Sequence, residues 1–392
     1  MLKRIQQASP QLLLFLSAVF SMGIAYSMID STFNNFINEK FPLSAFQRSF
    51  LEFPRELPGF LVVFVSAALW FLCSRRLGGL AMLLGAAGAL LIGFASSSYG
   101  TMVLWLFVYS MGQHLIMPVT SAIGMEMARE GQTGRRLGQL NSIRNLAAIL
   151  GSTVVALGFR YLGFNFHHTF VIAAVAFVVA AALFFSMQRE TTTRARTFLT
   201  LHREYRLYYT LGAISGARRQ LFLTFAPWVL VKVLEQPTSI MATLYTLGGV
   251  IGVLFQPLLG RAIDRLGERK VLAAEAVVLV FVCLGYAFAK DVLPPQTAFL
   301  AVCAFFLLDQ MIFSVGMARA TFLKKIARTP EDIQPALTAS VTIDHVFSIA
   351  AALLGGLVWN AWGFQYVFLF GVGIALLNLV FALQVRVRPA GV

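Results

Sequence analysis

The chain has 392 residues, of which 58% are hydrophobic and 12% are charged, and its 31 basic residues outnumber its 17 acidic ones. Soluble domains carry about 25% charged residues, so the composition excludes an ordinary soluble protein. The formal net charge of +14 would suit a nucleic-acid-binding protein unless the basic residues follow a membrane topology.

Apolar segments long enough to cross a bilayer as helices recur along the whole chain. Backbone groups in lipid must pair within their own segment, so the pattern predicts an all-α membrane protein with twelve transmembrane helices. The first segment is too long for the apolar region of a cleavable signal peptide, and we expect it to be the first span. The predicted spans are 11–36, 46–72, 78–98, 102–126, 139–161, 169–188, 207–231, 238–260, 269–289, 298–323, 335–358 and 364–385.

Basic residues gather on one side of this topology, in the two tails and in the loops that follow the even-numbered spans. The positive-inside rule therefore places both termini in the cytoplasm of a multi-pass plasma (inner) membrane protein. This distribution explains the basicity without a nucleic-acid partner. Cys73, Cys283 and Cys303 have no spacing typical of a disulfide framework or a metal site, so we expect no metal and no cofactor.

Six spans precede the longest polar segment, residues 189–206, and six follow it. This arrangement indicates an internal duplication. We predict an amino-terminal six-helix bundle over 1–188, a basic cytoplasmic linker over 189–206 and a carboxy-terminal six-helix bundle over 207–392.

Polar residues lie on the first two spans. Tyr26, Asp30 and Asn34 are spaced i, i+4, i+8 on the first span, and Glu52, Arg55 and Glu56 share one sector of the second. Because burial favours the neutral form of a carboxylic acid, these acids are candidate proton carriers. The alternative is that they only pair with arginines inside the bundle.

The middle spans add further candidates. Gln113 and His114 lie on the fourth span, and Arg144 lies on the fifth, where it either binds substrate or pairs with an acid. Arg218 and Arg219 lie near the middle of the seventh span, where an unpaired charge costs at least about 2.5–3.5 kcal/mol. They point about 100° apart, so we expect one to face a cavity and the other to pair with Asp309 or Asp344.

The loop after the eighth span, residues 260–270, reads GRAIDRLGERK. It resembles the G-x-x-x-D-R-x-G-x-R-K/R loop of the major facilitator superfamily, which recurs there after the second and eighth helices. The resemblance implies two pseudo-symmetric six-helix bundles, a central cavity and alternating access. It also assigns a gating role to the motif residues Gly260, Asp264, Arg265, Gly267 and Arg269.

The chain departs from the family's drug antiporters in three places. The loop after the second span, residues 66–76, lacks the motif aspartate. Val108 stands where those antiporters carry an arginine, and Gly151-Ser152 stands where they carry Gly-Pro. In the fold that the resemblance implies, helices 3, 6, 9 and 12 are peripheral, and predicted spans 3, 6 and 12 contain no ionisable residue in their interior.

These observations predict a monomeric, secondary active, proton-coupled transporter of a small anionic organic solute. The absence of a nucleotide-binding loop and of a nucleophile–base motif argues against an enzyme. A lipophilic-cation exporter is the alternative, and a transition-metal transporter using His114 and His345 is a weaker one. The candidate substrate-binding residues are Arg218, Arg219, Arg55, Arg144, Tyr26, Asn34, Gln113, His114, Gln310 and His345. The candidate proton-coupling residues are Asp30, Glu52, Glu56, Asp309 and Asp344.

Overall fold

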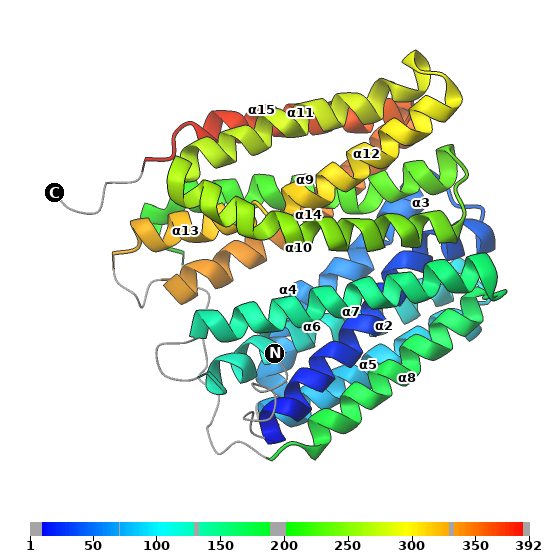
Figure 1. The fold of residues 1–392 in the computed structure, drawn as a ribbon, viewed down its shortest axis with the longest axis vertical. Helices are drawn as coiled ribbons and strands as arrows, with labels where there is room; N and C mark the ends of the chain where they lie inside the picture. The colour runs from blue at the N-terminus through cyan, green and yellow to red at the C-terminus, as the bar shows by residue number, and fades with distance from the viewer. Residues whose placement is uncertain (1–9, 70, 129–132, 189–200, 329–332, 387–392) are drawn as a thin grey trace. The chain divides into compact units, whose positions relative to one another are not determined.

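The computed structural model describes residues 10–69, 71–128, 133–188, 201–328 and 333–386. Within these ranges the chain is helical apart from short connections, and no strand occurs in them (Figure 1). Ten helices of the described chain are long and apolar enough to cross a membrane. The predicted all-α membrane fold is confirmed.

The first half of the chain forms seven helical segments in the described residues, because the second predicted span is divided in two. They are α2 (Pro10–Lys40), α3 (Ala45–Phe50), α4 (Glu52–Ala68), α5 (Ser74–Phe94), α6 (Tyr99–Glu126), α7 (Thr133–Tyr161) and α8 (Phe166–Ser186).

The second half begins with a short 3-10 turn, η1 (Arg203–Tyr205). The tenth predicted span of the chain lies in this half and is divided into two helices. The helices of the second half are α9 (Arg206–Trp228), the π-helical turn η2 (Val229–Val233), α10 (Thr238–Leu266), α11 (Glu268–Val292), α12 (Pro295–Phe313), α13 (Gly316–Ile326), α14 (Ile333–Trp362) and α15 (Phe364–Ala382).

The division of the second predicted span follows from a proline. Pro54 has no N–H to donate to the carbonyl of Phe50, and α3 ends at Phe50. The chain turns at Leu51 and α4 begins at Glu52, so that Pro54 lies in its first turn, where the missing donor costs little. The sequence analysis predicted one continuous span over 46–72, and the structure divides it at Leu51.

The chain divides into two compact units, and each takes segments from both halves of the sequence. Unit 1 comprises the described residues within Met1–Phe41, Leu57–Arg196 and Pro237–Gly249. Unit 2 comprises those within Pro42–Glu56, Thr197–Gln236 and Val250–Val392. The bundle boundaries expected from the sequence stay a prediction, and residues 189–200 of the expected linker lie outside the described residues.

In unit 1, α2 packs against α7 and α8, and α5 packs against α6 and α8. Two glycines allow α2 and α7 to approach closely. A Cβ atom at Gly23 would lie 2.7 Å from the Cβ of Ala147, and one at Gly151 would lie 2.7 Å from the carbonyl oxygen of Ile24. The middle of α2, which carries Tyr26, is thereby held against α7.

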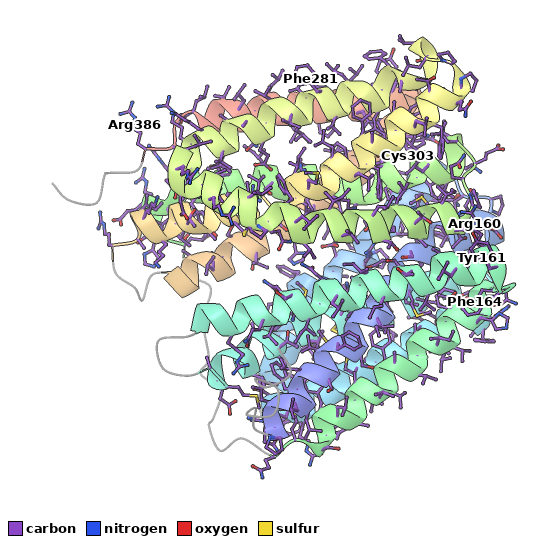
Figure 2. All side chains as sticks on the ribbon, viewed as in Figure 1. Arg160, Tyr161, Phe164, Phe281, Cys303 and Arg386 are labelled. Carbon is purple, nitrogen blue, oxygen red and sulfur yellow. The ribbon has the colours of Figure 1, made fainter. Side chains whose placement is uncertain are left out.

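In unit 2, α9 packs against α14 and α15, α11 packs against α12 and α15, and α3 packs against α14. Large apolar side chains cover the outside as well as the interior, for example Phe281 on α11, which is 64% exposed (Figure 2). Exposed apolar side chains of this kind suit a protein whose solvent is lipid.

Candidate functional site

The two adjacent arginines of α9 each bind a different acid in unit 2. Arg218 donates from Nη2 to Oδ1 of Asp309 on α12 at 2.8 Å, and its guanidinium lies 5.8 Å from the ring centroid of Phe222. Arg219 donates to Asp344 on α14. The sequence led us to expect one paired arginine and one facing a cavity, whereas the structure pairs both.

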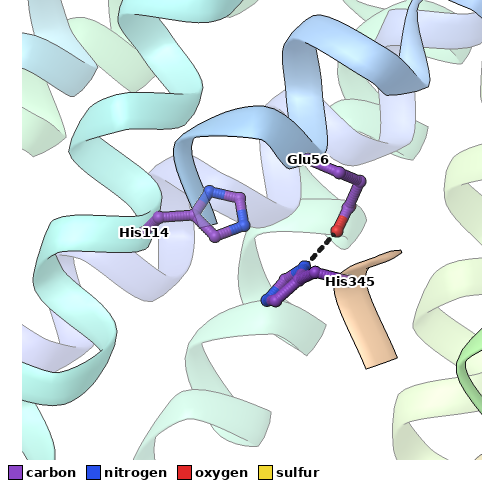
Figure 3. A group of neighbouring side chains, drawn as sticks. All are labelled: Glu56, His114 and His345. Atoms are coloured by element: carbon purple, nitrogen blue, oxygen red, sulfur yellow. Dashed lines mark hydrogen bonds and ion pairs between the residues drawn. The ribbon is translucent and has the colours of Figure 1, made fainter. Parts of the chain in front are cut away.

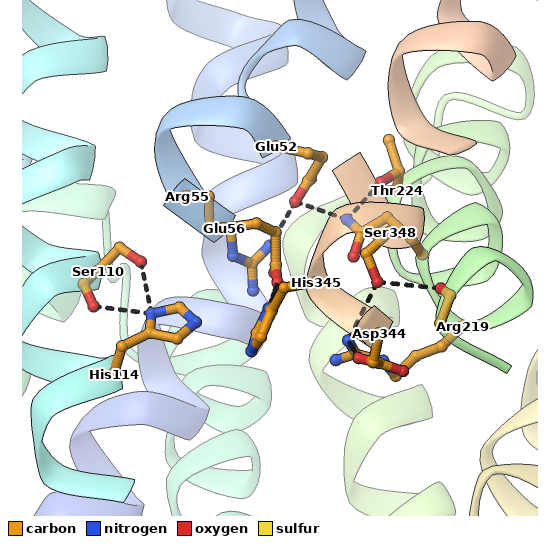
Figure 4. A network of polar contacts seen from close by, with 12 residues as sticks. Glu52, Arg55, Glu56, Ser110, His114, Arg219, Thr224, Asp344, His345 and Ser348 are labelled. Atoms are coloured by element: carbon orange, nitrogen blue, oxygen red, sulfur yellow. Dashed lines mark hydrogen bonds and ion pairs between the residues drawn. The ribbon is translucent and has the colours of Figure 1, made fainter. Parts of the chain in front are cut away.

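These two ion pairs differ in their exposure. Arg218 and Asp309 are 5% and 12% exposed, whereas Arg219 and Asp344 are 22% and 23% exposed. Arg219 also donates to Ser348 Oγ at 3.2 Å, and Ser348 donates to the carbonyl oxygen of Gly216 at 3.1 Å (Figure 4). The ion pair of Arg218 is therefore more deeply buried than that of Arg219.

Glu52 is the centre of a polar cluster in unit 2 that is buried except for Arg55, which is 20% exposed. It accepts from Arg48 Nη1 on α3 at 2.8 Å and from Gln220 Nε2 on α9 at 2.8 Å. Arg55 Nη1 lies 3.7 Å from Oε2 of Glu52 (Figure 4). The guanidinium of Arg48 lies 5.6 Å from the ring centroid of Trp228. Arg48 and Gln220 are 0% exposed, and Glu52 is 1% exposed. This cluster joins α3 and α4 to α9.

A second link joins α4 to α14. Glu56 Oε2 lies 2.7 Å from His345 Nδ1, and the two side chains are 8% and 9% exposed (Figure 3). His114, which Figure 3 also draws, belongs to unit 1, where its Nδ1 lies 3.0 Å from Oγ of Ser110. A carboxylate beside an imidazole can take up or release a proton within a hydrogen-bonded pair.

Arg144 on α7 differs from Arg55, Arg218 and Arg219, which each lie near an acid. Its Nη2 donates to the hydroxyl oxygen of Thr120 on α6, and within the described part of the chain it makes no ion pair. Its Nε is buried without a hydrogen-bond partner there, and so is the hydroxyl oxygen of Tyr26. Asp30 lies one helical turn after Tyr26 on α2, and α2 packs against α7, which carries Arg144. Unit 1 thus contains a guanidinium without a counter-charge from the described residues.

Other predicted site residues are placed as follows. Asn34 is 8% exposed and His114 is 7% exposed, and both are in unit 1. Asp30 and Gln113 in unit 1 and Gln310 in unit 2 are partly buried. In unit 1, α2, which carries Tyr26 and Asp30, packs against α7, which carries Arg144. It brings Glu52, Arg55 and Glu56 together with the α9 and α14 residues in unit 2.

The expected gating motif lies at the turn between α10 and α11. Gly267 has φ +80°, which favours glycine, and this one residue separates the two helices. Asp264, Arg265 and Arg269 are exposed, and no ion pair joins them to other described residues. The gating role predicted for them stays a prediction.

Glu268 is the buried charge of this loop. It is 2% exposed, and its Oε1 lies 2.7 Å from Nζ of Lys325 at the end of α13. Unit 1 has a corresponding ion pair in which the positions of the acidic and the basic residue are exchanged. Arg75 on α5 donates to Glu126 on α6 at 2.6 Å. In each unit an ion pair joins the first turn of one helix to the end of the next span.

The sequence analysis missed several members of these networks. Arg48 was not among the predicted site residues, although its i, i+4 spacing to Glu52 was a usable signal. Gln220, Thr120 and Ser348 carried no such signal, because their partners lie on other helices. Glu268 stood inside the motif but was not assigned a role.

The fold and these buried charges define a polytopic membrane transporter, and comparison with known proteins identifies its family. The family model described as Major Facilitator Superfamily matches residues 15–343 and, in a second match, residues 210–391. The chain belongs to this superfamily. It is also 26% identical over 300 residues to an uncharacterized MFS-type transporter of Methanocaldococcus jannaschii, covering 74% of this chain and 73% of that protein.

Solved structures with the same fold extend over nearly the whole chain. The nucleoside transporter NupG has a TM-score of 0.76 at 12% identity, with 96% of this chain and 99% of that chain covered. A D-xylose-proton symporter has a TM-score of 0.72 at 16% identity, with 95% and 97% covered. A bacterial homologue of the lysosomal transporter Spinster, inward-facing and occupied, has 0.72 at 14%, with 98% and 100% covered. At these identities the likeness shows the fold alone.

Proposed function

We propose that this transporter is secondary active and proton-coupled, and that it moves a small organic anion by alternating access across the plasma membrane, with both termini in the cytoplasm. The finer parts of this proposal concern the charge of the solute and the coupling ion. Each rests on a separate feature of the described residues.

The proposal that the solute is an anion rests on the partners of Arg144. Arg218 and Arg219 have acidic partners, and Arg55 lies 3.7 Å from Glu52. Arg144 has a hydroxyl partner instead, and the described residues place no acid within ion-pair distance of it. A charged side chain inside a span persists only with a partner, a water-filled cavity or a ligand. We therefore expect an anionic solute to supply the negative charge that faces Arg144.

The carboxylates of unit 2 support proton coupling. Glu56, Asp309 and Asp344 each lie against a basic side chain on a different helix of the unit. Protonation of any one of them breaks or weakens an interhelical ion pair. A proton can therefore shift the balance between conformations in which these pairs are made and conformations in which they are broken. The D-xylose-proton symporter supports the proposal by showing that this fold can couple to protons.

Purified protein in proteoliposomes provides the test. We expect an inward proton gradient to drive accumulation of one or more radiolabelled organic anions from a panel, and a protonophore to abolish it. Arg144→Gln should remove this uptake. Arg160→Gln is the matched control, because Arg160 is an exposed arginine at the end of the same helix (Figure 2).

Two outcomes would overturn the proposal. Uptake that is unchanged in Arg144→Gln would remove the reason for an anionic solute. Transport confined to lipophilic cations, with export driven by the proton gradient, would favour the exporter alternative, and transport confined to divalent metal ions would favour the metal alternative.

A further inference from the structure

We infer that one end of unit 2 binds the headgroups of anionic phospholipids. This surface, which we call the basic end, lies near the points where α9, α10, α11, α13 and α15 begin or end. Its exposed basic residues are Arg203, Arg206, Arg261, Arg265, Arg269, Lys270, Lys324 and Arg386. The inference concerns a lipid and not the transported solute, and only the choice of leaflet rests on the proposed orientation of the chain.

A shared apolar core gathers these basic residues at one place. Tyr205, Ile263, Val271, Leu323 and Val385 are buried in a single apolar cluster of unit 2. In the sequence, each of them lies one or two positions from a residue of the basic end. The backbones that carry the exposed cations are therefore packed together, although they come from different helices.

The acidic residues that the structure describes at this end do not neutralise it. Glu204 and Glu268 each form an ion pair at 2.7 Å with a further basic residue, Arg328 and Lys325 respectively. Asp264 is exposed near the end of α10, and no ion pair joins it or the residues of the basic end to other described residues. The positive-inside rule explains on which side of the membrane basic residues lie, but an exposed cluster of this kind still attracts an anionic partner.

Apolar side chains within the basic end indicate that this partner is a lipid. Leu266, next to Arg265 at the end of α10, is 55% exposed, and Leu383, which follows α15, is 47% exposed. A soluble polyanion would leave both leucines in water. A phospholipid places its headgroup phosphate against the cations and its glycerol and acyl region against the apolar side chains. With both termini in the cytoplasm, as proposed above, the basic end meets the leaflet that carries the anionic lipids.

Native mass spectrometry of the purified protein, released from detergent micelles, tests the inference by measuring the affinity of individual lipids. The probes are palmitoyl-oleoyl phosphatidylglycerol, the phosphatidylcholine with the same chains, and glycerol 3-phosphate as the soluble headgroup. A basic side chain near an anionic headgroup changes the affinity by about fivefold, so two or more contacts should make phosphatidylglycerol bind about tenfold more tightly than phosphatidylcholine, or better. Glycerol 3-phosphate should not displace the phosphatidylglycerol.

Two pairs of lysines provide a matched comparison. Lys270→Gln combined with Lys324→Gln removes two charges from the basic end and leaves the residues of the expected gating motif unchanged. It should weaken phosphatidylglycerol binding by about tenfold or more and leave phosphatidylcholine binding as it was. Lys232→Gln combined with Lys290→Gln removes two exposed lysines of unit 2 outside the basic end, from η2 and from the last turn of α11, and should change neither affinity. Elution profiles and unfolding midpoints show whether each variant is folded.

Three results would overturn the inference. The first is an equal affinity of the unmodified protein for the two phospholipids. The second is a phosphatidylglycerol affinity that both lysine pairs lower equally, or that neither lowers. The third is displacement of the phospholipid by glycerol 3-phosphate, which would identify a site for a free phosphate and not for a lipid. All three would leave the proposed anion transport intact, because the Arg144 variants test it separately.

Discussion

Glu56 on α4 and His345 on α14 are 289 positions apart in the chain, yet Glu56 Oε2 lies 2.7 Å from His345 Nδ1. Other charged groups in the same network are Glu52 and Arg55 on α4, Arg219 on α9 and Asp344 on α14 (Figure 4). A proton added to Glu56 removes the negative charge that faces the imidazole. Protonation of Glu56 would therefore weaken this contact between α4 and α14, which is the basis of the proton coupling proposed above.

This relationship predicts how coupling can be separated from binding. In proteoliposomes, Glu56→Gln and His345→Gln should lose accumulation driven by a proton gradient. Both should retain exchange of labelled for unlabelled substrate, which needs no net proton movement. The controls are Glu39→Gln and His167→Gln, because both side chains are exposed. Loss of exchange together with accumulation would indicate a structural role instead.

The Arg218–Asp309 pair predicts a large effect on stability. Asp309→Asn leaves the guanidinium of Arg218, 5% exposed, without its counter-charge, and should lower the free energy of unfolding by about 3–5 kcal/mol. Thermal unfolding in detergent measures the loss. The control is Asp291→Asn at an exposed position.

Removing both charges of that pair should be far less harmful. Arg218→Met combined with Asp309→Leu replaces the ion pair with apolar side chains, which is often neutral or stabilising. The double variant should therefore unfold at a higher temperature than Asp309→Asn. A double variant that is as unstable as the single one would show that the pair also fixes the packing of α9 against α12.

The contact between α3 and α14 predicts a steric effect. A Cβ atom at Gly356 on α14 would overlap the side chain of Ser49 on α3. Gly356→Ala should lower the free energy of unfolding by about 1–3 kcal/mol because the two helices must separate. Gly373→Ala on α15, where a Cβ meets nothing within 4 Å, should be neutral or slightly stabilising. Equal effects on the unfolding midpoint would contradict the close contact.

The turn of the loop motif predicts a backbone effect. Gly267 has φ +80° and ψ 160°, a region that is essentially restricted to glycine, so Gly267→Ala should cost about 1–3 kcal/mol. Gly260 lies inside α10 with open space around it, and Gly260→Ala should not destabilise the protein. The measurement is the thermal unfolding midpoint of each variant, with Gly267→Ala in the strained turn and Gly260→Ala inside a helix. A smaller loss at Gly267 than at Gly260 would contradict this explanation.

The sequence predicted the family and the helical fold, and it located most of the charged residues that lie inside the spans. It could not predict which of them pair. The expectation that one of Arg218 and Arg219 would lack an acid was reasonable for a single helix, but Asp309 and Asp344 come from two other helices and meet one arginine each. Arg48 was not among the predicted site residues, and the packing of α3 against α14 buries it completely.

The sequence by itself determined that the chain crosses the membrane many times and carries charges within its spans. The reason is that lipid imposes a minimum length and an apolar composition on every spanning helix, and both can be read locally. Only the tertiary structure decided that Arg218 and Arg219 are neutralised by acids and that Arg144 has a hydroxyl partner instead. An ion pair between helices requires two side chains to lie within a few ångströms of each other. The paired residues here are separated by 91 and by 125 positions in the chain, and no local sequence pattern shows that they meet.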